Sequence, residues 1–284
     1  MTDTVAPPSG VGGCREVGPG ETATAFRVLE ADPLVTAPAA EKFVLSGVAG
    51  GVDGRFLTRG GPEQSLAFVG SSVLPILGDA ADLEALAHAV VESGVGPMSL
   101  HGRRDLVAHM WPALERGWGS AREYRASQFL MALRSPVDPT LVLEGTRPAT
   151  LQEFDSVLAA AAAMYREELH SDPFEVGAGA PFRRRVARSV ARGRTWVGID
   201  GGEVFFKADI AAISSGVAQI QGVWVDPSVR GTGLGAGGTA AVCAALQKRG
   251  LTPSLVVNGT NEPARRAYKR VGMVDLVDYA TVLL

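Results

Sequence analysis

The sequence predicts an α/β protein with a mixed α+β sheet, arranged as two domains. Segments with the period of strands alternate along the chain with segments that have the period of amphipathic helices. At 284 residues the chain is long for one compact core. Hydrophobic residues make up 46% of the sequence and charged residues 20%, which is ordinary for a globular protein.

Residues 1–24 are rich in Gly, Pro, Ser and Thr, and we expect a flexible tail there. Residues 25–135 predict a smaller N-terminal α/β domain of unknown role. Its expected strands are 65–69, 73–77, 97–100 and 124–133, and its expected helices are 80–92 and 106–114. No catalytic constellation stands out in this half of the chain.

A Pro-rich linker at 135–139 leads to the second domain, residues 145–284. The spacing of Thr150 and Glu153 predicts a capping box that begins a long alanine-rich helix ending at about residue 169. The other expected elements are strands at 141–143, 195–199, 204–210, 217–225, 254–257, 273–276 and 279–283, and helices at 182–192, 236–249 and 263–271. Asp200-Gly201-Gly202 predicts a hairpin turn. The order is β-α-α-β-β-β-α-β-α-β-β.

Composition excludes several classes of protein. The formal net charge is −3, although residues 145–284 carry 16 Lys and Arg against 13 Asp and Glu. Cys14 and Cys243 lie far apart and the four histidines lack metal-ligand spacing, so we expect neither a disulfide framework nor a metal site. No apolar run is long enough to span a membrane, and the N-terminus does not resemble a signal peptide. We therefore expect a cytoplasmic protein that contacts no membrane.

The stretch Arg230-Gly231-Thr232-Gly233-Leu234-Gly235 carries the clearest functional signal. It follows the predicted strand 217–225 and opens the predicted helix 236–249. In such a turn, successive backbone N–H groups and the helix dipole favour an anion, and glycines let a phosphate approach the backbone. The turn therefore predicts a ligand that carries phosphate.

Two nucleotide sites fit this turn less well. A P-loop has a lysine directly after its last glycine, whereas the next lysine here is Lys248. Gly233, Gly235 and Gly238 match a dinucleotide fingerprint, but the following strand ends in Asn258 instead of an acidic residue for the ribose. Three hairpin-linked strands also precede the turn, where a dinucleotide site needs a parallel βαβ unit.

The order Val225-x-Pro227, then Arg230-x-x-Gly233-x-Gly235, resembles the pyrophosphate-binding motif of the GNAT superfamily of acyl-CoA-dependent N-acyltransferases. The resemblance covers about residues 145–284. It implies a GNAT-like acyltransferase fold, with acetyl-CoA (coenzyme A) as the cofactor.

A second match lies on the next predicted helix. Asn261-x-x-Ala264-x-x-x-Tyr268, followed by Gly272-Met273, is similar to the asparagine-to-tyrosine segment of the same superfamily. The whole chain resembles two-domain members whose N-terminal domain has no known function. That half has no Arg-x-x-Gly-x-Gly motif, and it could be a degenerate GNAT-like unit.

The resemblance also implies which residues bind the cofactor. They are Val223, Val225, Arg230, Gly231, Thr232, Gly233, Leu234, Gly235 and Asn261. The backbone N–H groups near Val223 and Val225 would polarise the thioester carbonyl and stabilise the developing oxyanion. Asn261 fits equally well as a helix N-cap, because Pro263 then falls in the first turn.

Tyr268 is the general acid that the resemblance implies. A phenol can protonate the leaving thiolate because the pKa values of the two groups are similar. The alternative role for Tyr268 is a side chain that packs at the edge of the cofactor.

The general base is less clearly indicated. Many members of the superfamily carry a carboxylate on the strand before the glycine turn, whereas this strand offers Gln219 and Gln221. By its position at the end of the long helix, Glu168 is our candidate base, with Glu167 and His170 beside it. The alternative is that this helix end is simply solvated.

The densest basic cluster comprises Arg183, Arg184, Arg185, Arg188, Arg192 and Arg194. A spacing of four places Arg184, Arg188 and Arg192 on one helix face, opposite an apolar stripe. This face is either solvated or a clamp for an acidic acceptor. We do not expect nucleic acid as a partner, because the chain is acidic overall and no aromatic residues interleave the cluster.

Two functions are compatible with these patterns. The first is an acetyl-CoA-dependent N-acyltransferase, which moves an acetyl group to a primary amine of a small molecule or protein. The alternative is a catalytically inactive acyl-CoA-binding sensor or interaction module, which the missing strand carboxylate would suit. The expected partners are an acyl-CoA donor and an unidentified amine acceptor, with a homodimer as one further option.

Overall fold

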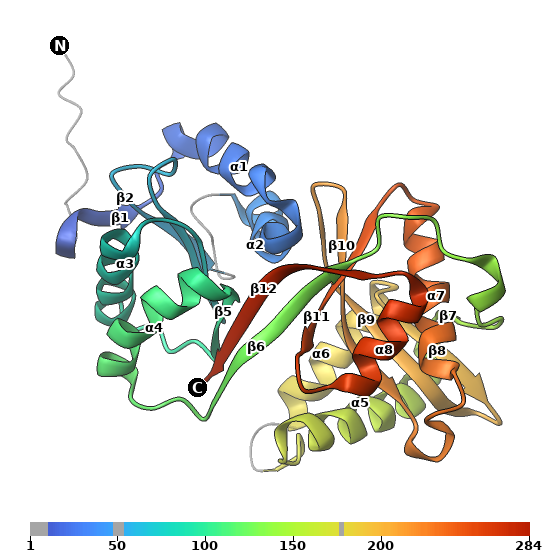
Figure 1. Cartoon of the computed structure of the whole chain (residues 1–284). Coiled ribbons are helices and arrows are strands. Elements are labelled where there is room, and N and C mark those ends of the chain that lie inside the picture. Colours follow the sequence, from blue (N-terminus) through green and yellow to red (C-terminus); the bar gives the residue numbers. More distant parts are fainter. Residues whose placement is uncertain (1–10, 48–53, 176–178) are drawn as a thin grey trace. The chain divides into compact units, whose positions relative to one another are not determined.

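A computed structural model of the chain describes residues 11–47, 54–175 and 179–284 (Figure 1). The chain divides into two compact units. The first unit contains Met1–Leu130, Asn258–Thr260 and Leu276–Leu284, and the second contains Met131–Val257 and Asn261–Asp275. The C-terminal segment of the chain therefore belongs to the first unit.

The first unit is a sheet with helices on both faces. Its strands are β1 (Cys14–Glu16), β2 (Gly54–Arg59), β3 (Leu66–Gly70), β4 (Val73–Leu77) and β5 (Ser99–Arg103), and its helices are α1 (Thr22–Ala31), α2 (Pro33–Ser46), α3 (Ala80–Glu92) and α4 (Arg104–Trp118). The strand order is β1-β2-β3-β4-β5-β12, where β12 is Val274–Leu283. β12 is antiparallel to β5, with Tyr279 opposite Arg103.

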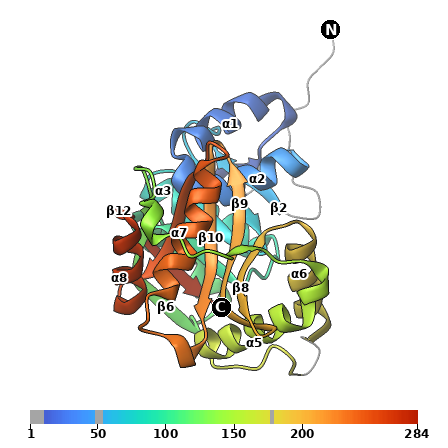
Figure 2. The same ribbon diagram turned by 90° about the vertical axis from the view of Figure 1, so that its right-hand side faces the viewer.

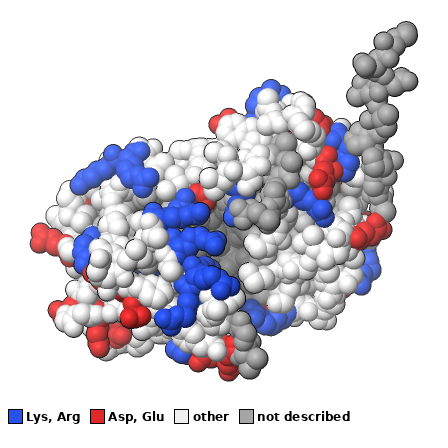
Figure 3. Space-filling view, turned by 180° about the vertical axis from the view of Figure 1, so that it is seen from behind, with Lys and Arg blue, Asp and Glu red and all other residues white. Residues whose placement is uncertain are grey.

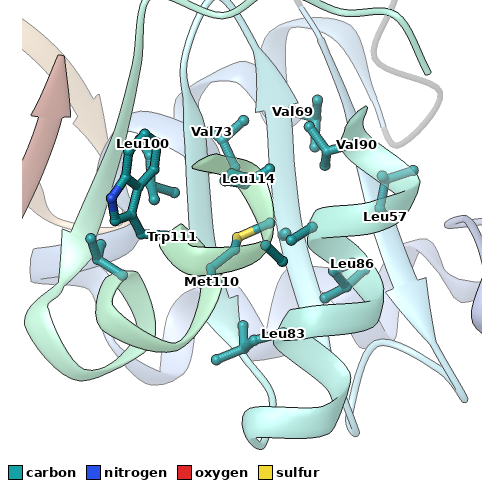
Figure 4. Close-up of a cluster of buried hydrophobic side chains, with 14 of the residues drawn as sticks. Leu57, Val69, Val73, Leu83, Leu86, Val90, Leu100, Met110, Trp111 and Leu114 are labelled. Atoms are coloured by element: carbon teal, nitrogen blue, oxygen red, sulfur yellow. The ribbon is translucent and has the colours of Figure 1, made fainter. Parts of the chain in front are cut away.

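Residues that alternate along the strands of this unit supply two separate cores, as the period of a strand requires. Leu57, Val69 and Val73 pack under α3 and α4, whose Leu83, Leu86, Met110 and Leu114 point toward them (Figure 4). On the opposite face, Phe56, Phe68 and Leu74 pack with Leu29 and Phe43 of α1 and α2. The cores explain why this half of the chain folds although it carries no catalytic motif.

The second unit holds the glycine turn. Its strands are β7 (Arg147–Pro148), β8 (Thr195–Asp200), β9 (Glu203–Ser214), β10 (Val217–Val225) and β11 (Thr252–Asn258), and its helices are α5 (Phe154–Leu169), α6 (Gly179–Ala191), α7 (Leu234–Gln247) and α8 (Glu262–Val271). The strand order is β11-β10-β9-β8-β7, and only the β10–β11 pair among these is parallel. The chain enters this unit at the end of β6 (Glu123–Ala132).

Helices cover both faces of the second sheet as well. α7 lies against β9 and β10, as Figure 2 shows, and approaches so closely that a Cβ on Gly238 would stand 2.6 Å from the Phe206 ring. α5 and α6 bury Val157, Phe182 and Val186 in a core with residues of β8 to β10. Gly238 is thus a packing residue and not part of a dinucleotide fingerprint.

The two units have the same topology. In chain order the first reads β1-α1-α2-β2-β3-β4-α3-β5-α4-β6, and the second reads β7-α5-α6-β8-β9-β10-α7-β11-α8-β12. The strand orders β1-β2-β3-β4-β5 and β7-β8-β9-β10-β11 also correspond. The chain therefore folds as a tandem of one topology.

Several sequence predictions match the structure closely. α3 spans the predicted 80–92 and β10 the predicted 217–225. Thr150 and Glu153 form the predicted capping box ahead of α5. Asp200 pairs with Glu203 where the hairpin turn was predicted.

Other local predictions were wrong or incomplete. Residues 141–143, predicted as a strand, lie in and after a 3₁₀ turn that Asp138 caps by accepting from the Thr140 N–H. The predicted final pair of strands is one strand, β12. Residues 14–16, within the expected tail, form β1 because Cys14 is buried and pairs with Arg59; residues 1–10 of that tail lie outside the described residues.

Candidate functional site

A β-bulge in β10 opens the sheet of the second unit between β10 and β11. The parallel pairing of β10 with β11 covers Val217 to Ile220 and stops there. The antiparallel pairing with β9 continues to Val225, with a register shift between Gln221 and Trp224. Gly222 lies in this shift with φ 55°, a conformation that glycine adopts without strain. The two parallel strands therefore separate just beyond Ile220.

The backbone of β10 beyond the bulge presents N–H groups to this opening. The Asp226 N–H donates to the Phe205 carbonyl of β9 at 2.9 Å. Because the backbone direction alternates along a strand, the N–H groups of Val223 and Val225 face away from β9. Two parallel donors therefore point to the side where β11 has left.

The glycine turn follows directly. Residues Pro227–Val229 form a 3₁₀ turn, and Gly231 and Gly233 have positive φ values of 81° and 95°. Gly233 is the N-cap of α7 and supplies no side-chain acceptor to the first turn of the helix. The first N–H groups of α7 therefore remain available to an anion, which the helix dipole also favours.

The Arg230 side chain holds the turn against β10 and α5. Its Nε donates to the Val225 carbonyl at 2.9 Å, and its Nη2 donates to Glu167 Oε2 at 2.7 Å. Glu167 Oε1 also accepts from the Trp224 indole N–H at 3.1 Å. These two hydrogen bonds fix the Arg230 guanidinium at the rim of the turn, where it also lines the pocket.

A pocket of about 690 Å³ joins these features. Of the residues predicted for the site, those that line it are Val223, Val225, Arg230, Gly231, Gly233, Gly235, Asn261, Tyr268 and Glu168. The other two lie in the same turn, where Thr232 Oγ1 donates to the Val229 carbonyl at 2.7 Å and Leu234 begins α7. The structure thus brings the predicted residues together around one cavity.

Tyr268 and Glu168 both line this pocket. Only 7% of Tyr268 is exposed, and burial raises the pKa of its phenol above the usual value, with smaller contributions from the charges of Glu168 and Cys243. Cys243 of α7 is fully buried, which raises the pKa of its thiol to about 12. At neutral pH the phenol therefore keeps its proton, and the raised pKa also makes it a weaker acid than an ordinary phenol.

Asn261 has the capping role that the sequence left open. Its side chain accepts from the Ala264 N–H at 3.2 Å and begins α8, with Pro263 in the first turn. The residue also lines the pocket. The N-cap therefore fixes the start of the helix that carries Tyr268.

Sequence reasoning missed a cation next to the glycine turn. Arg266 and Arg270 of α8 line the pocket. A Cβ built on Gly233 would lie 3.8 Å from Arg270 Nη1, so this guanidinium stands beside the N-terminus of α7. The spacing of four between Arg266 and Arg270 indicates a basic face on α8. The sequence does not show that this face lies next to the glycine turn, because that depends on the fold.

A buried ion pair beside the bulge was also missed. Asp209 of β9 lies opposite Gln221, and its Oδ2 accepts a hydrogen bond from Lys207, which is 1% exposed. Asp209 Oδ1 accepts from Thr195 Oγ1 at 2.7 Å. A Cβ on Gly222 would stand 3.3 Å from Asp209 Oδ2, so a carboxylate does lie next to the site, on the strand adjacent to the predicted one.

Comparisons with known proteins agree with this architecture. Residues 207–281 match the FR47-like protein family, and residues 54–157 match a domain of unknown function, DUF4081. The fold resembles a GCN5-related N-acetyltransferase from Sphaerobacter thermophilus (TM-score 0.58, 16% identity, 94% of this chain and 93% of that chain). It also resembles a GNAT-family acetyltransferase from Colwellia psychrerythraea (0.57, 10%, 95% and 99%) and a Drosophila protein (0.60, 16%, 95% and 98%).

The chain has the GNAT fold. The predicted resemblance and the predicted fold class are both confirmed, including a second α/β unit ahead of the GNAT-like region. No curated protein matches the sequence. Within the described residues, no helix has the length and apolar character that crossing a membrane requires.

The first unit repeats the order of strands and helices of the second unit. Between β4 and α3, however, it has no open glycine turn that could hold an anion. Only Gly78 and Asp79 separate β4 from α3, where eight residues separate β10 from α7. The Asp79 carboxylate caps α3 by accepting from the Asp82 N–H at 2.8 Å. A negative charge of the protein thus occupies the position where the second unit leaves its helix N-terminus open.

Proposed function

We propose that the chain is an acetyl-CoA-dependent N-acyltransferase that moves an acetyl group to a primary amine of a small molecule or protein. The observation that carries this proposal is the single pocket that contains three required features. These are the open N-terminus of α7, the part of β10 that no longer pairs with β11 and the buried phenol of Tyr268. The acetyltransferase names of two structural neighbours support the same activity.

The donor would lie along the turn and β10. The coenzyme A pyrophosphate would accept hydrogen bonds from the turn Gly231 to Gly235, with Arg270 as a neighbouring positive charge. The thioester carbonyl would accept from the N–H groups of Val223 and Val225. Donors placed in this way stabilise the oxyanion that develops during attack, and the loss of one such donor typically slows a reaction by about 10²–10³.

Direct attack then requires two proton transfers. The acceptor nitrogen forms a bond to the thioester carbon while the carbon–sulfur bond breaks. Glu168 would take the proton that the nitrogen loses, and Tyr268 would give its proton to the thiolate that leaves. The products are an amide and coenzyme A with a free thiol.

Thiol release tests the proposal. The full-length protein would be incubated with acetyl-CoA and a panel of primary amines, and the free thiol would be measured with a disulfide reagent. We expect release that depends on both the protein and one class of amine. Binding of acetyl-CoA without thiol release for any amine would instead support the sensor alternative, and absence of binding would exclude both.

A further inference from the structure

Helix α6 presents five exposed arginines that the pocket does not use. They are Arg183, Arg184, Arg185, Arg188 and Arg192, where Arg192 directly follows the helix and continues its hydrogen bonding to Arg188. Within residues 11–47, 54–175 and 179–284, no carboxylate pairs with these five guanidinium groups. Exposed arginines elsewhere, such as Arg27 and Arg116, do pair with a carboxylate. A band of basic side chains lies on the face that Figure 3 views.

The fold fixes the orientation of this α6 arginine face. Phe182, Val186 and Val190 on the opposite side of the helix are buried in the core of the second unit. Arg183 lies over the Phe154 ring at 5.7 Å and Arg185 over the Phe182 ring at 5.1 Å. These cation–π contacts orient Arg183 and Arg185 at the edge of the face.

The charges of this face repel one another. Like charges four residues apart on a helix destabilise it, and α6 has no acidic residue in its first turn to offset them. A bound polyanion would remove this repulsion. The exposed face of α6 is therefore complementary in charge to a negatively charged partner.

We propose that the α6 arginine face binds an acidic polypeptide segment. The rise of an α-helix places Arg184, Arg188 and Arg192 about 6 Å apart along the helix axis. Alternate side chains of an extended peptide repeat at about 6.6–6.8 Å on one side. Carboxylates at alternate positions of a peptide can thus each meet one guanidinium.

Nucleic acid fits this face less well. Single strands bind through aromatic rings on which bases stack, whereas the rings of Phe154 and Phe182 are already covered by arginines. The chain also carries a formal net charge of −3, which disfavours a partner with many phosphates. An acidic polypeptide places only a few charges on the face and avoids this repulsion.

A labelled peptide of alternating Glu and Ser tests the proposal by fluorescence anisotropy with the full-length protein at low salt. The test variant is the triple substitution Arg184→Gln, Arg188→Gln and Arg192→Gln. The matched control, Arg27→Gln, Arg116→Gln and Arg249→Gln, removes the same charge from exposed positions elsewhere. Thermal melting of both variants verifies that they remain folded.

We expect the wild-type and control proteins to bind the peptide and the test variant to bind about tenfold more weakly, with binding that weakens as salt rises. Absence of peptide binding to the wild-type protein would overturn the proposal, and so would an equal loss in both variants. Tighter binding of a labelled oligothymidylate at the same face would overturn it in favour of nucleic acid. None of these measurements uses acyl-CoA, so their outcome is independent of acyl transfer.

Discussion

Among single residues, Tyr268 is the one on which the chemical step depends most directly. Its phenol is buried in the pocket wall, and the raised pKa keeps it protonated at neutral pH. We expect Tyr268→Phe to lower kcat by about 10²–10⁴, the range for a general acid, and to change the affinity for acetyl-CoA little. Thiol release at saturating acetyl-CoA measures the first effect, and calorimetry measures the second.

Tyr165→Phe is the matched control for this substitution. Tyr165 of α5 packs edge-on against Phe182 at 5.5 Å, and it does not line the pocket. Its variant should keep the wild-type kcat. A Tyr268→Phe protein that retains full kcat would show that another group protonates the thiolate.

The ion pair of Lys207 and Asp209 predicts a large effect on stability. Lys207 is 1% exposed, so Asp209→Asn leaves a buried ammonium without its carboxylate. We expect a loss of about 3–5 kcal/mol in the free energy of unfolding, measured by urea denaturation. The double variant Lys207→Met with Asp209→Asn should recover most of this loss.

An exposed ion pair provides the comparison for that experiment. Glu63→Gln breaks the contact of Glu63 with Arg27, whose side chains are 70% and 65% exposed. Its cost should be about 0–1 kcal/mol. A similarly small cost for Asp209→Asn would contradict the account of a buried pair.

Among the structural elements, the N-terminus of α7 is the one that defines the donor site. Gly233 has φ 95°, and a Cβ there would point toward Arg270 at the pocket. We expect Gly233→Ala to weaken acetyl-CoA binding about tenfold or more, because it strains the turn and intrudes on the space of the phosphates. Calorimetry with acetyl-CoA measures this change.

Gly201→Ala is the control for Gly233→Ala, because it strains a glycine with positive φ that lies outside the pocket. Gly201 lies in the β8–β9 hairpin with φ 56°, has open space around its would-be Cβ, and does not line the pocket. This variant should lose stability but keep wild-type affinity for acetyl-CoA. Equal affinities of the two variants would place the pyrophosphate elsewhere.

The elements that could be predicted from sequence are those with a strong local pattern. The period of α3 and the continuous apolar run of β10 predicted both spans. α1 and α2 were missed, because α2 is apolar on most sides and contains Pro38, which indicates a break in a helix. The bulge at Gly222 depends on pairing with β9 and β11, which no local pattern encodes.

At the scale of the whole molecule, the last strand of the chain completes the sheet of the first unit. β12 pairs with β5, and His101 of β5 shares hydrogen bonds with Tyr279 of β12 at 2.7 Å and with Ser72 at 3.2 Å. This long-range pairing could not be predicted from the sequence, where residues 273–283 read as the end of the second domain. The mixed α/β pattern of the first half suggested a degenerate GNAT-like unit, but the repeated strand order could not be predicted, because the two halves share no common motif.

The burial of the His101 imidazole predicts how the free energy of unfolding depends on pH. Burial lowers the pKa of its imidazole from 6.5 to about 4, so the unfolded chain takes up this proton first as the pH falls. The contribution of His101 to the free energy of unfolding should therefore be fully present above pH 6.5. It should decline as the pH falls toward 4, by about 3 kcal/mol at most. Urea denaturation across this range measures the slope.

Two variants test whether His101 causes this dependence of stability on pH. His101→Gln should flatten it, whereas His109→Gln, at an exposed position on α4, should leave it unchanged. The same slope in all three proteins would mean that other groups, and not His101, carry the acid sensitivity.

Titration calorimetry of the full-length protein with acetyl-CoA tests directly whether the glycine turn and β10 hold an acyl-CoA donor. We expect one site per chain, with a Kd between about 1 μM and 1 mM, and competition by coenzyme A. Absence of saturable binding up to millimolar acetyl-CoA, by a protein that melts cooperatively, would show that the glycine turn and β10 do not hold an acyl-CoA donor.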